Sequence, residues 1–132
     1  MTHAIRLGAD IGGTFTDIVF QDSETGECVT AKVLSTPENP ALSVLEGIKE
    51  RLPEMHVHGF TPLEVWQGAH TLGISVREFL TRLRDAGLGT LPGTAAEILD
   101  DRVRAHLCPD KVRTSEWAEV MITAHELGLR ST

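Results

Sequence analysis

The opening third of the chain consists of short apolar segments separated by turn residues. Residues 4–11, 15–21 and 28–34 are dominated by apolar and β-branched side chains, which predicts three strands. Gly12, Gly13 and Thr14 predict a tight turn between the first two strands, and the polar cluster at 22–26 predicts the next turn. The chain is therefore expected to begin with a strand meander.

Helical spacing of apolar residues follows this meander. Asn39 is expected to cap a helix that has Pro40 at its first position and ends at Pro53. Gly47 weakens the middle of this helix. Its apolar stripe consists of Ala41, Leu42, Val44, Leu45, Ile48 and Leu52.

A different pattern begins near residue 55. Residues 55–60 predict a short strand. Residues 61–64 and 75–78 each have threonine or serine followed three positions later by glutamate, and this capping-box pattern predicts two helix starts. The two helices are expected to end at Gly73 and Gly87 and to carry their apolar side chains inward: Leu63, Trp66, Ala69 and Leu72 in the first, and Val76, Phe79, Leu80 and Leu83 in the second.

The same alternation continues toward residue 132. Residues 89–93 predict a strand that runs into a loop, and residues 130–132 fall where another strand is due. Three further helices are expected: over 95–99, over 101–107, and from Thr114 or Ser115 to Gly128. Alternating strands and helices are typical of a parallel sheet or barrel. A (β/α)8 barrel needs about 200 residues or more, so only part of one is expected here.

Composition narrows the class of protein. The chain has 132 residues, 41% of them hydrophobic, and a net charge of −7. An ordinary folded core is expected, and non-specific binding to nucleic acid or an anionic membrane is disfavoured. No signal peptide and no apolar run of about 20 residues is visible, so the cytoplasm is the expected location. Cys28 and Cys108 are expected to be free thiols.

Charge is distributed unevenly along the chain. Residues 1–48 hold 7 acidic and 2 basic residues, whereas residues 49–132 hold 12 acidic and 10 basic residues. This shift suggests a join near residues 47–52, which separates a first piece, 1–48, from a second piece, 49–132.

The first chemical signal is the glycine-containing turn between the first two strands. Adjacent glycines lack the Cβ atoms that would block a phosphate group, and backbone amides in such a turn can point at phosphate oxygens. A strand-end aspartate could hold hydrated magnesium. A plain hairpin turn is the alternative. The candidate phosphate-binding residues are Asp10, Gly12, Gly13, Thr14 and Thr16.

The segment 10–17 resembles the N-terminal region of the hydantoinase A and 5-oxoprolinase family, and 31–37 and 39–48 fit the same family. The resemblance covers about residues 4–48. It implies an actin-like (ribonuclease H-like) fold and ATP-linked opening of a cyclic amide, with ATP and magnesium as ligands. A second phosphate loop and an adenosine pocket, which such a site requires, have no match after residue 48.

A second signal is the pair His56 and His58. Residues two apart on a strand project from the same face, so these histidines are expected side by side. A metal site is one interpretation, but further ligands at later strand ends are missing. A role in lining a ligand pocket, or a hydrogen-bonded pair in the core, is the preferred interpretation, and no metal is expected.

The second piece is similar to the deazaflavin (FO) synthases, which are radical-SAM enzymes. Radical-SAM enzymes of menaquinone synthesis are relatives of this family. The resemblance covers about residues 48–132 and is carried by segments 48–53, 56–60, 61–64, 82–89, 91–101, 108–111 and 123–128. It implies part of a (β/α) barrel and transfer of a tyrosine-derived hydroxybenzyl group to 5-amino-6-ribitylamino-uracil. It also implies S-adenosylmethionine and a four-iron four-sulfur cluster held by Cys-x3-Cys-x2-Cys, a motif that these 132 residues do not contain.

The resemblance also implies which residues line the substrate and S-adenosylmethionine cavity. The two glutamates among them have a simpler explanation, because each is expected early in a helix, where a carboxylate interacts favourably with the helix dipole. Five arginines are expected on solvated helix faces: Arg77, Arg82, Arg84, Arg102 and Arg104. The cavity candidates are His56, His58, Glu64, Gly93, Thr94 and Glu97.

Three hypotheses follow for function. The chain is a fragment related to FO synthase that is inactive alone, or an ATP-binding segment of the hydantoinase/oxoprolinase type, or a non-enzymatic chimeric product. No cofactor is expected to bind this chain by itself. Its expected partners are the missing parts of a radical-SAM barrel or another subunit.

Overall fold

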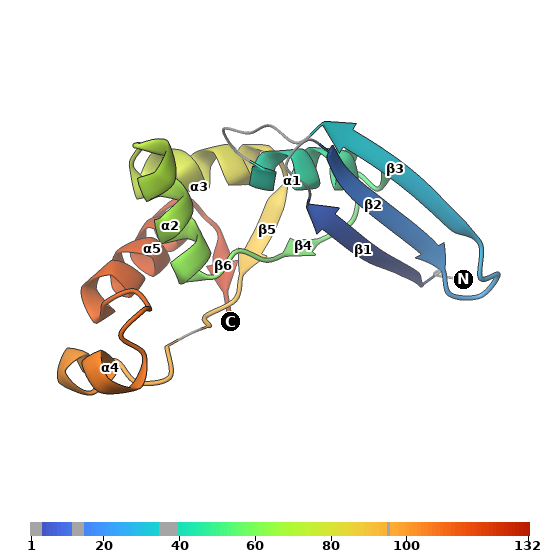
Figure 1. Ribbon diagram of the computed structural model, residues 1–132. Helices are drawn as coiled ribbons and strands as arrows, with labels where there is room; N and C mark the ends of the chain where they lie inside the picture. The colour runs from blue at the N-terminus through green and yellow to red at the C-terminus, as the bar shows by residue number, and fades with distance from the viewer. Residues whose placement is uncertain (1–3, 12–14, 35–39, 95) are drawn as a thin grey trace. The chain divides into compact units, whose positions relative to one another are not determined.

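A computed structural model describes residues 4–11, 15–34, 40–94 and 96–132 (Figure 1). The chain divides into two compact units, Met1–Met55 and His56–Thr132, and each unit is described by itself. The predicted turn at 12–14 and the predicted cap Asn39 lie outside the described residues.

The first unit contains the predicted meander. Strands β1 (Ile5–Ile11), β2 (Phe15–Asp22) and β3 (Cys28–Leu34) form an antiparallel sheet in the order β1-β2-β3. In the turn after β2, Asp22 Oδ1 accepts hydrogen bonds from the backbone N–H groups of Glu24 and Thr25 at 2.8 and 2.9 Å. This Asx-type turn explains why the hairpin reverses at the predicted polar cluster.

Helix α1 (Pro40–Arg51) covers the meander and contacts all three strands. Its length agrees with the prediction. The core between helix and sheet contains two residues from β2 and two from α1, namely Ile18, Phe20, Leu45 and Ile48. After the helix, Lys49 Nζ donates hydrogen bonds to the carbonyl oxygens of Pro53 and Met55 at 3.1 and 2.6 Å, which fixes the segment that ends the first unit.

The second unit is built on a parallel sheet. Strands β4 (Val57–His58), β5 (Leu88–Leu91) and β6 (Arg130–Ser131) pair in the order β4-β5-β6, and both pairings are parallel. Strand β6 occupies the position that the sequence left for a further strand. An α/β fold with an antiparallel meander followed by a parallel sheet is therefore confirmed. The described strands form an open sheet, without closure into a barrel.

Four helices accompany this sheet: α2 (Pro62–Leu72), α3 (Val76–Asp85), α4 (Asp101–Leu107) and α5 (Thr114–Glu126). Helices α2, α3 and α5 contact one another, α3 contacts β5, and α5 contacts β6 (Figure 1). Side chains from these elements form a common core, whose fully buried members are Val65, Leu80, Leu83, Leu91 and Val120.

The predicted helix starts are confirmed, with one shift. Thr61 caps α2 through a complete capping box with Glu64, and the Ser75 hydroxyl accepts from the backbone N–H of Glu78 in α3. Helix α5 was expected to be capped by Thr114 or Ser115, but its N-cap is Arg113, whose N–H donates to Glu116 at 2.7 Å.

Three predictions of burial and helix position differ from the structure. Among residues 96–99 no helix forms, because the carbonyls of Ala96 and Ile98 accept hydrogen bonds from Arg104. Arg104 itself is 3% exposed rather than solvated. In α2 the buried residues are Pro62, Val65 and Ala69, so only one member of the predicted stripe is fully inside.

Candidate functional site

Two histidines share one hydroxyl group on the parallel sheet. His56 Nε2 lies 2.8 Å from Thr90 Oγ1, and His58 Nδ1 lies 2.7 Å from the same oxygen. Both distances are those of good hydrogen bonds. The expectation that the two histidines lie side by side is therefore met, and Thr90, which the sequence did not single out, links them.

An irregularity in β5 places Thr90 beneath the histidines. Val57 pairs with Leu88 and the next residue, His58, pairs with Thr90, so Gly89 is an extra residue in the ladder. Such a bulge reverses the alternation of faces, since two residues oppose one step of the partner strand. Leu88 and Leu91, three apart, are consequently both buried at 4% and 0% exposure, while Thr90 pairs with the exposed His58.

Gly89 is required by the packing of His56. A Cβ atom built on Gly89 would lie 2.4 Å from His56 Cε1, 2.6 Å from Nδ1 and 3.1 Å from the carbonyl oxygen of Val57. The imidazole therefore rests on the glycine, and only a residue without a Cβ permits this approach.

A third histidine contacts the last strand on the other face of the sheet, the face of the buried Leu91. His125 Nε2, from α5, lies 2.8 Å from Ser131 Oγ on β6. Ser131 pairs with Leu91, and Arg130 pairs with Thr90. Because paired residues in neighbouring strands project from the same face, Arg130 stands beside Thr90 and His58, and all three are at least partly exposed. This more exposed face carries donors, acceptors and one positive charge.

Glu64 is occupied by its role in the helix cap. Its Oε2 accepts from the backbone N–H of Thr61 at 2.7 Å and from the Thr61 hydroxyl at 2.9 Å. These bonds satisfy a helix terminus. They hold the carboxylate at the first turn of α2.

The other three predicted cavity residues lie after β5. A Cβ on Gly93 would lie 2.2 Å from the carbonyl oxygen of Thr132, so this glycine also allows a close backbone approach. Thr94 is exposed. Glu97 has a left-handed backbone with φ of 22° and accepts a hydrogen bond from Lys111 Nζ at 2.5 Å. This bond raises the pKa of the Lys111 ammonium above its usual value.

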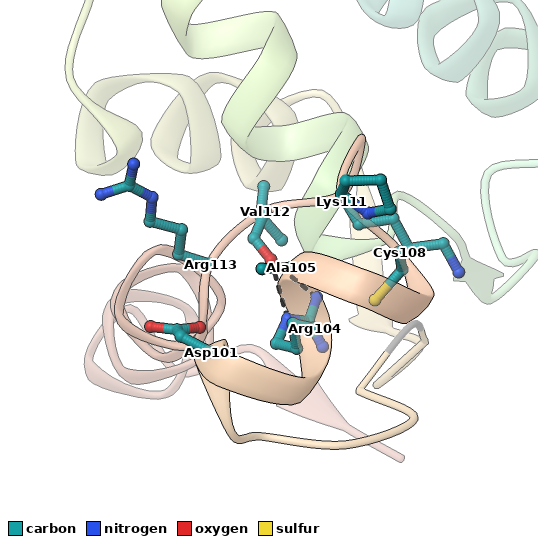
Figure 2. Close-up of a pocket in the computed structure, with 8 residues that line it drawn as sticks. Asp101, Arg104, Ala105, Cys108, Lys111, Val112 and Arg113 are labelled. Carbon is teal, nitrogen blue, oxygen red and sulfur yellow. Dashed lines mark hydrogen bonds between the residues drawn. The ribbon is translucent and has the colours of Figure 1, made fainter.

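A pocket of about 370 Å³ lies beside α4 and the loop after it (Figure 2). Arg104 dominates its floor, and its guanidinium points toward Val112. Nε and Nη2 donate to the Val112 carbonyl at 3.1 and 2.6 Å, and Nη1 donates to Ala96 and Ile98 at 3.1 and 2.8 Å. One buried side chain thus ties the loops on both sides of α4 together.

Two aspartates stabilise the start of α4 and the segment that follows it. The side chain and backbone of Arg102 bond to Asp100 and lower the pKa of that carboxyl group. The backbone N–H of Thr114 donates to Asp101 Oδ1 at 2.8 Å and lowers the pKa of Asp101. Both carboxylates therefore stay ionised at neutral pH and anchor the loop between α4 and α5.

The phosphate candidates are described only in part. Gly12, Gly13 and Thr14 lie outside the described residues, and Thr16 is described only through its backbone in β2. Asp10 is exposed on β1 and pairs with Asp17, which in turn pairs with Lys32 on β3. Lys32 Nζ lies 3.1 Å from Asp17, so this row carries two carboxylates and one ammonium group.

The thiols of this chain do not fit a radical-SAM cluster. Such a cluster needs three nearby cysteine thiolates. The sequence has two cysteines; Cys28 is exposed in the first unit and Cys108 is buried in the second. Among the described residues no group of three or more histidine, cysteine, aspartate or glutamate side chains is arranged to hold a metal ion.

None of the described helices combines the length and the apolar character that crossing a bilayer demands.

Known proteins resemble this chain in two ways. Residues 6–73 match the family described as "Hydantoinase/oxoprolinase N-terminal region". The chain is also 53% identical over 89 residues to 5-amino-6-(D-ribitylamino)uracil–L-tyrosine 4-hydroxyphenyl transferase 1 of Methanosarcina barkeri. The FO synthases of Streptomyces avermitilis and Mycobacterium tuberculosis (strain H37Rv) are each 52% identical, over 96 and 99 residues.

The coverage of these matches is unequal. The transferase match takes in 67% of this chain and 24% of the Methanosarcina protein, and the two FO synthase matches take in 73% of this chain and 11 to 12% of the synthases. The chain thus spans a quarter or less of the relatives it matches. Because the family match and the transferase match each cover more than half of the chain, they share residues.

The family match extends to residue 73, beyond the stretch of about 4–48 that carries the resemblance in the sequence, and it passes the border between the two compact units. Sequence identity near one half over such lengths shows common descent with the FO synthases and the 4-hydroxyphenyl transferases. The chain therefore belongs to the hydantoinase/oxoprolinase N-terminal region family, and it is homologous to part of the FO synthase and 4-hydroxyphenyl transferase proteins.

Proposed function

We propose that this chain is a part of a deazaflavin-forming transferase of the radical-SAM class, and that its second unit supplies one wall of the substrate pocket. The reaction would transfer the tyrosine-derived hydroxybenzyl group to 5-amino-6-(D-ribitylamino)uracil. The observation that carries this proposal is the cluster of His56, Thr90 and His58, in which His58 ends β4, Thr90 lies one residue before the end of β5, and His56 immediately precedes β4. Substrates of parallel β/α folds bind at the carboxyl ends of the strands, where His58 and Thr90 lie.

The proposed architecture follows from the same placement. The parallel strands β4, β5 and β6 with their helices would be consecutive β/α units of a (β/α) barrel. The meander with α1 would be the start of an actin-like domain. Under this proposal the pieces meet near residues 47–52, giving segments 1–48 and 49–132. The remaining pocket residues would be Glu64, Gly93, Thr94 and Glu97.

A wall of this kind needs the rest of its barrel. Each parallel strand requires cover on both faces, and the cluster's face of the sheet is the more exposed one. We therefore propose that the missing parts of the barrel, or another subunit, cover this face. They would also supply the cysteines that bind the iron–sulfur cluster. By itself the chain is expected to be inactive.

A segment exchange tests this function. The matching segment of the Methanosarcina barkeri transferase would be replaced by residues 56–132 of this chain, and formation of the joined product from tyrosine and 5-amino-6-(D-ribitylamino)uracil would be followed by mass spectrometry. The hybrid is expected to form product, and a hybrid carrying His58→Ala is expected to lose it. A folded hybrid that holds its iron–sulfur cluster but forms no product would overturn the proposal.

A second function is favoured by the family match over residues 6–73 and by the carboxylate row of the meander. Asp10 and Asp17 stand opposite each other across β1 and β2, and a divalent cation would relieve the repulsion between them. Under this alternative the first unit binds ATP and magnesium through Asp10, Gly12, Gly13, Thr14 and Thr16.

Calorimetry with ATP and magnesium tests the alternative. A saturable heat that is lost in Asp10→Ala but kept in Asp110→Ala, an exposed carboxylate of the second unit, would support it. No heat in the unaltered chain would rule it out.

A further inference from the structure

We propose that Thr90 couples the two histidines into a donor–acceptor pair that recognises the N–H and C=O edge of a cyclic amide or imide. The ligand in this inference rests on the proposed function, because 5-amino-6-(D-ribitylamino)uracil carries such an edge. The coupling itself rests on the geometry of Thr90, His56 and His58 alone.

The tautomers of His56 and His58 are coupled because both rings share the single hydroxyl hydrogen of Thr90. Thr90 Oγ1 lies 2.8 Å from His56 Nε2 and 2.7 Å from His58 Nδ1, and it has no third partner among the described residues. A hydroxyl has one hydrogen to donate and two lone pairs to accept with. It can donate to one ring at most, and the proposal assigns its hydrogen to one of the two rings, so that the other ring donates to Thr90 Oγ1.

The ring that accepts the Thr90 hydrogen determines which outer ring nitrogen carries a hydrogen and which is bare. If Thr90 donates to His58 Nδ1, the hydrogen of the neutral His58 ring sits on Nε2, and His56 presents a bare Nδ1. If Thr90 donates to His56 Nε2, the roles are exchanged. With both rings neutral, the cluster offers one N–H donor and one nitrogen acceptor in either state.

This pattern selects a class of ligand. A cyclic amide or imide presents an N–H and a C=O side by side and can satisfy both nitrogens, whereas a carboxylate offers acceptors only. Both histidines are exposed side chains, and Nδ1 of His56 lies over Gly89, which has no Cβ to cover it. Gly89 contributes by holding the His56 ring in place, since its missing Cβ leaves room for Cε1 and Nδ1. Thr90 is thus a positioning residue that acts through the two histidines.

Ring ¹⁵N NMR of the intact chain tests the coupling without any ligand. At about pH 8, above the ordinary histidine pKa of about 6.5, one of the two nitrogens facing Thr90 is expected to carry a hydrogen and the other to be bare. His56→Gln and His58→Gln assign the signals. Thr90→Val is expected to uncouple the rings, Thr90→Ser to restore the coupling, and Thr71→Val, at an exposed threonine on α2, to change nothing.

Two results would overturn the coupling. One is a hydrogen on both His56 Nε2 and His58 Nδ1 in the unaltered chain. The other is that Thr90→Val leaves the tautomers of both rings unchanged. The unaltered chain alone suffices for the first result, so a variant that fails to fold does not block the test.

Uracil serves as the probe for the ligand class. It is expected to shift the ¹⁵N signals of both outer ring nitrogens and to bind at least about tenfold more weakly to Thr90→Val than to Thr90→Ser. Acetate, which offers acceptors only, is expected to shift at most the signal of the outer nitrogen that carries a hydrogen. If the two rings are coupled but uracil shifts neither outer ring nitrogen, the proposed ligand class is wrong. If uracil binds but the hybrid transferase of the segment exchange is inactive, the proposed transferase function is contradicted and the ligand class is not.

Discussion

The imidazole of His56 lies against the α-carbon of Gly89, so closely that a methyl group on Gly89 would stand 2.4 Å from the ring. Gly89 is also the bulge residue that turns Thr90 toward the histidines. One residue therefore sets both the position of the first ring and the direction of the hydroxyl that holds it.

Replacing Gly89 with alanine is expected to displace the His56 ring while His58 keeps its bond to Thr90. The exposed ring can swing away, so the cost should be about that of one hydrogen bond, on the order of 1 kcal/mol in the free energy of unfolding. Urea denaturation and the ring signals of both histidines measure the two effects. Gly59→Ala is the matched control, because nothing lies within 4 Å of a Cβ there. Unchanged His56 signals in Gly89→Ala would contradict this packing.

The Thr61 cap of α2 makes a separate prediction about stability. Thr61→Ala removes the hydroxyl that accepts from the backbone N–H of Glu64 and is expected to lower the free energy of unfolding by about 1 kcal/mol. Glu64→Gln keeps a carbonyl oxygen for the N–H of Thr61 and should cost less. Thr71→Ala, at an exposed site within the same helix, controls for general effects of losing threonine. Equal losses in Thr61→Ala and Thr71→Ala would show that the cap is unimportant.

Arg104 should be among the most sensitive positions of the second unit. Arg104→Met removes four hydrogen bonds to three carbonyl groups and is expected to cost about 3 kcal/mol, measured by urea denaturation. Arg104→Lys should recover only part of this, since an ammonium group lacks the planar fork. Arg102→Met is the control, because that side chain is 91% exposed and surface ion pairs contribute little. A loss in Arg104→Met no larger than in the control would contradict the anchoring role.

The depressed pKa values of Asp100 and Asp101 predict sensitivity to acid. Their folded pKa values lie below the ordinary value of 3.8. The stability they contribute is therefore fully present above that value and is lost as the pH falls through the folded pKa.

Unfolding by urea between about pH 6 and about pH 3 should show this loss, and the double variant Asp100→Asn, Asp101→Asn should show a flatter pH dependence. Asp110→Asn, on the neighbouring loop, serves as the control. If the double variant loses as much stability in acid as the unaltered chain, the two carboxylates do not contribute in this way.

Much of the fold was predictable because its signals are local. The three strands of the meander, α1 and the starts of α2 and α3 follow from turn residues, prolines and capping patterns within a few positions. The apolar stripe of α3 was also predictable, since Val76, Phe79, Leu80 and Leu83 are all buried as expected. Local chemistry thus determined element type over most of both units.

Contacts between distant residues explain what was missed. Thr90 meets His56 and His58 across more than thirty residues, and its direction depends on a bulge in β5. The available local signal was Gly89, the first residue of the predicted strand, because a glycine in a strand often marks a bulge. The burial of Arg104 was missed because its partners are the backbone carbonyls of Ala96, Ile98 and Val112, which sequence composition does not reveal.

Calorimetric titration of the intact chain with 5-amino-6-(D-ribitylamino)uracil at about pH 8 tests the role of the cluster most directly. We predict a saturable heat from one site, with binding weakened at least about tenfold, or about 1.4 kcal/mol, in His58→Ala and in Thr90→Val. His106→Ala, at an exposed histidine on α4, should bind like the unaltered chain. No saturable heat, or equal binding by all four proteins, would contradict the assignment of the His56–Thr90–His58 cluster as a substrate site.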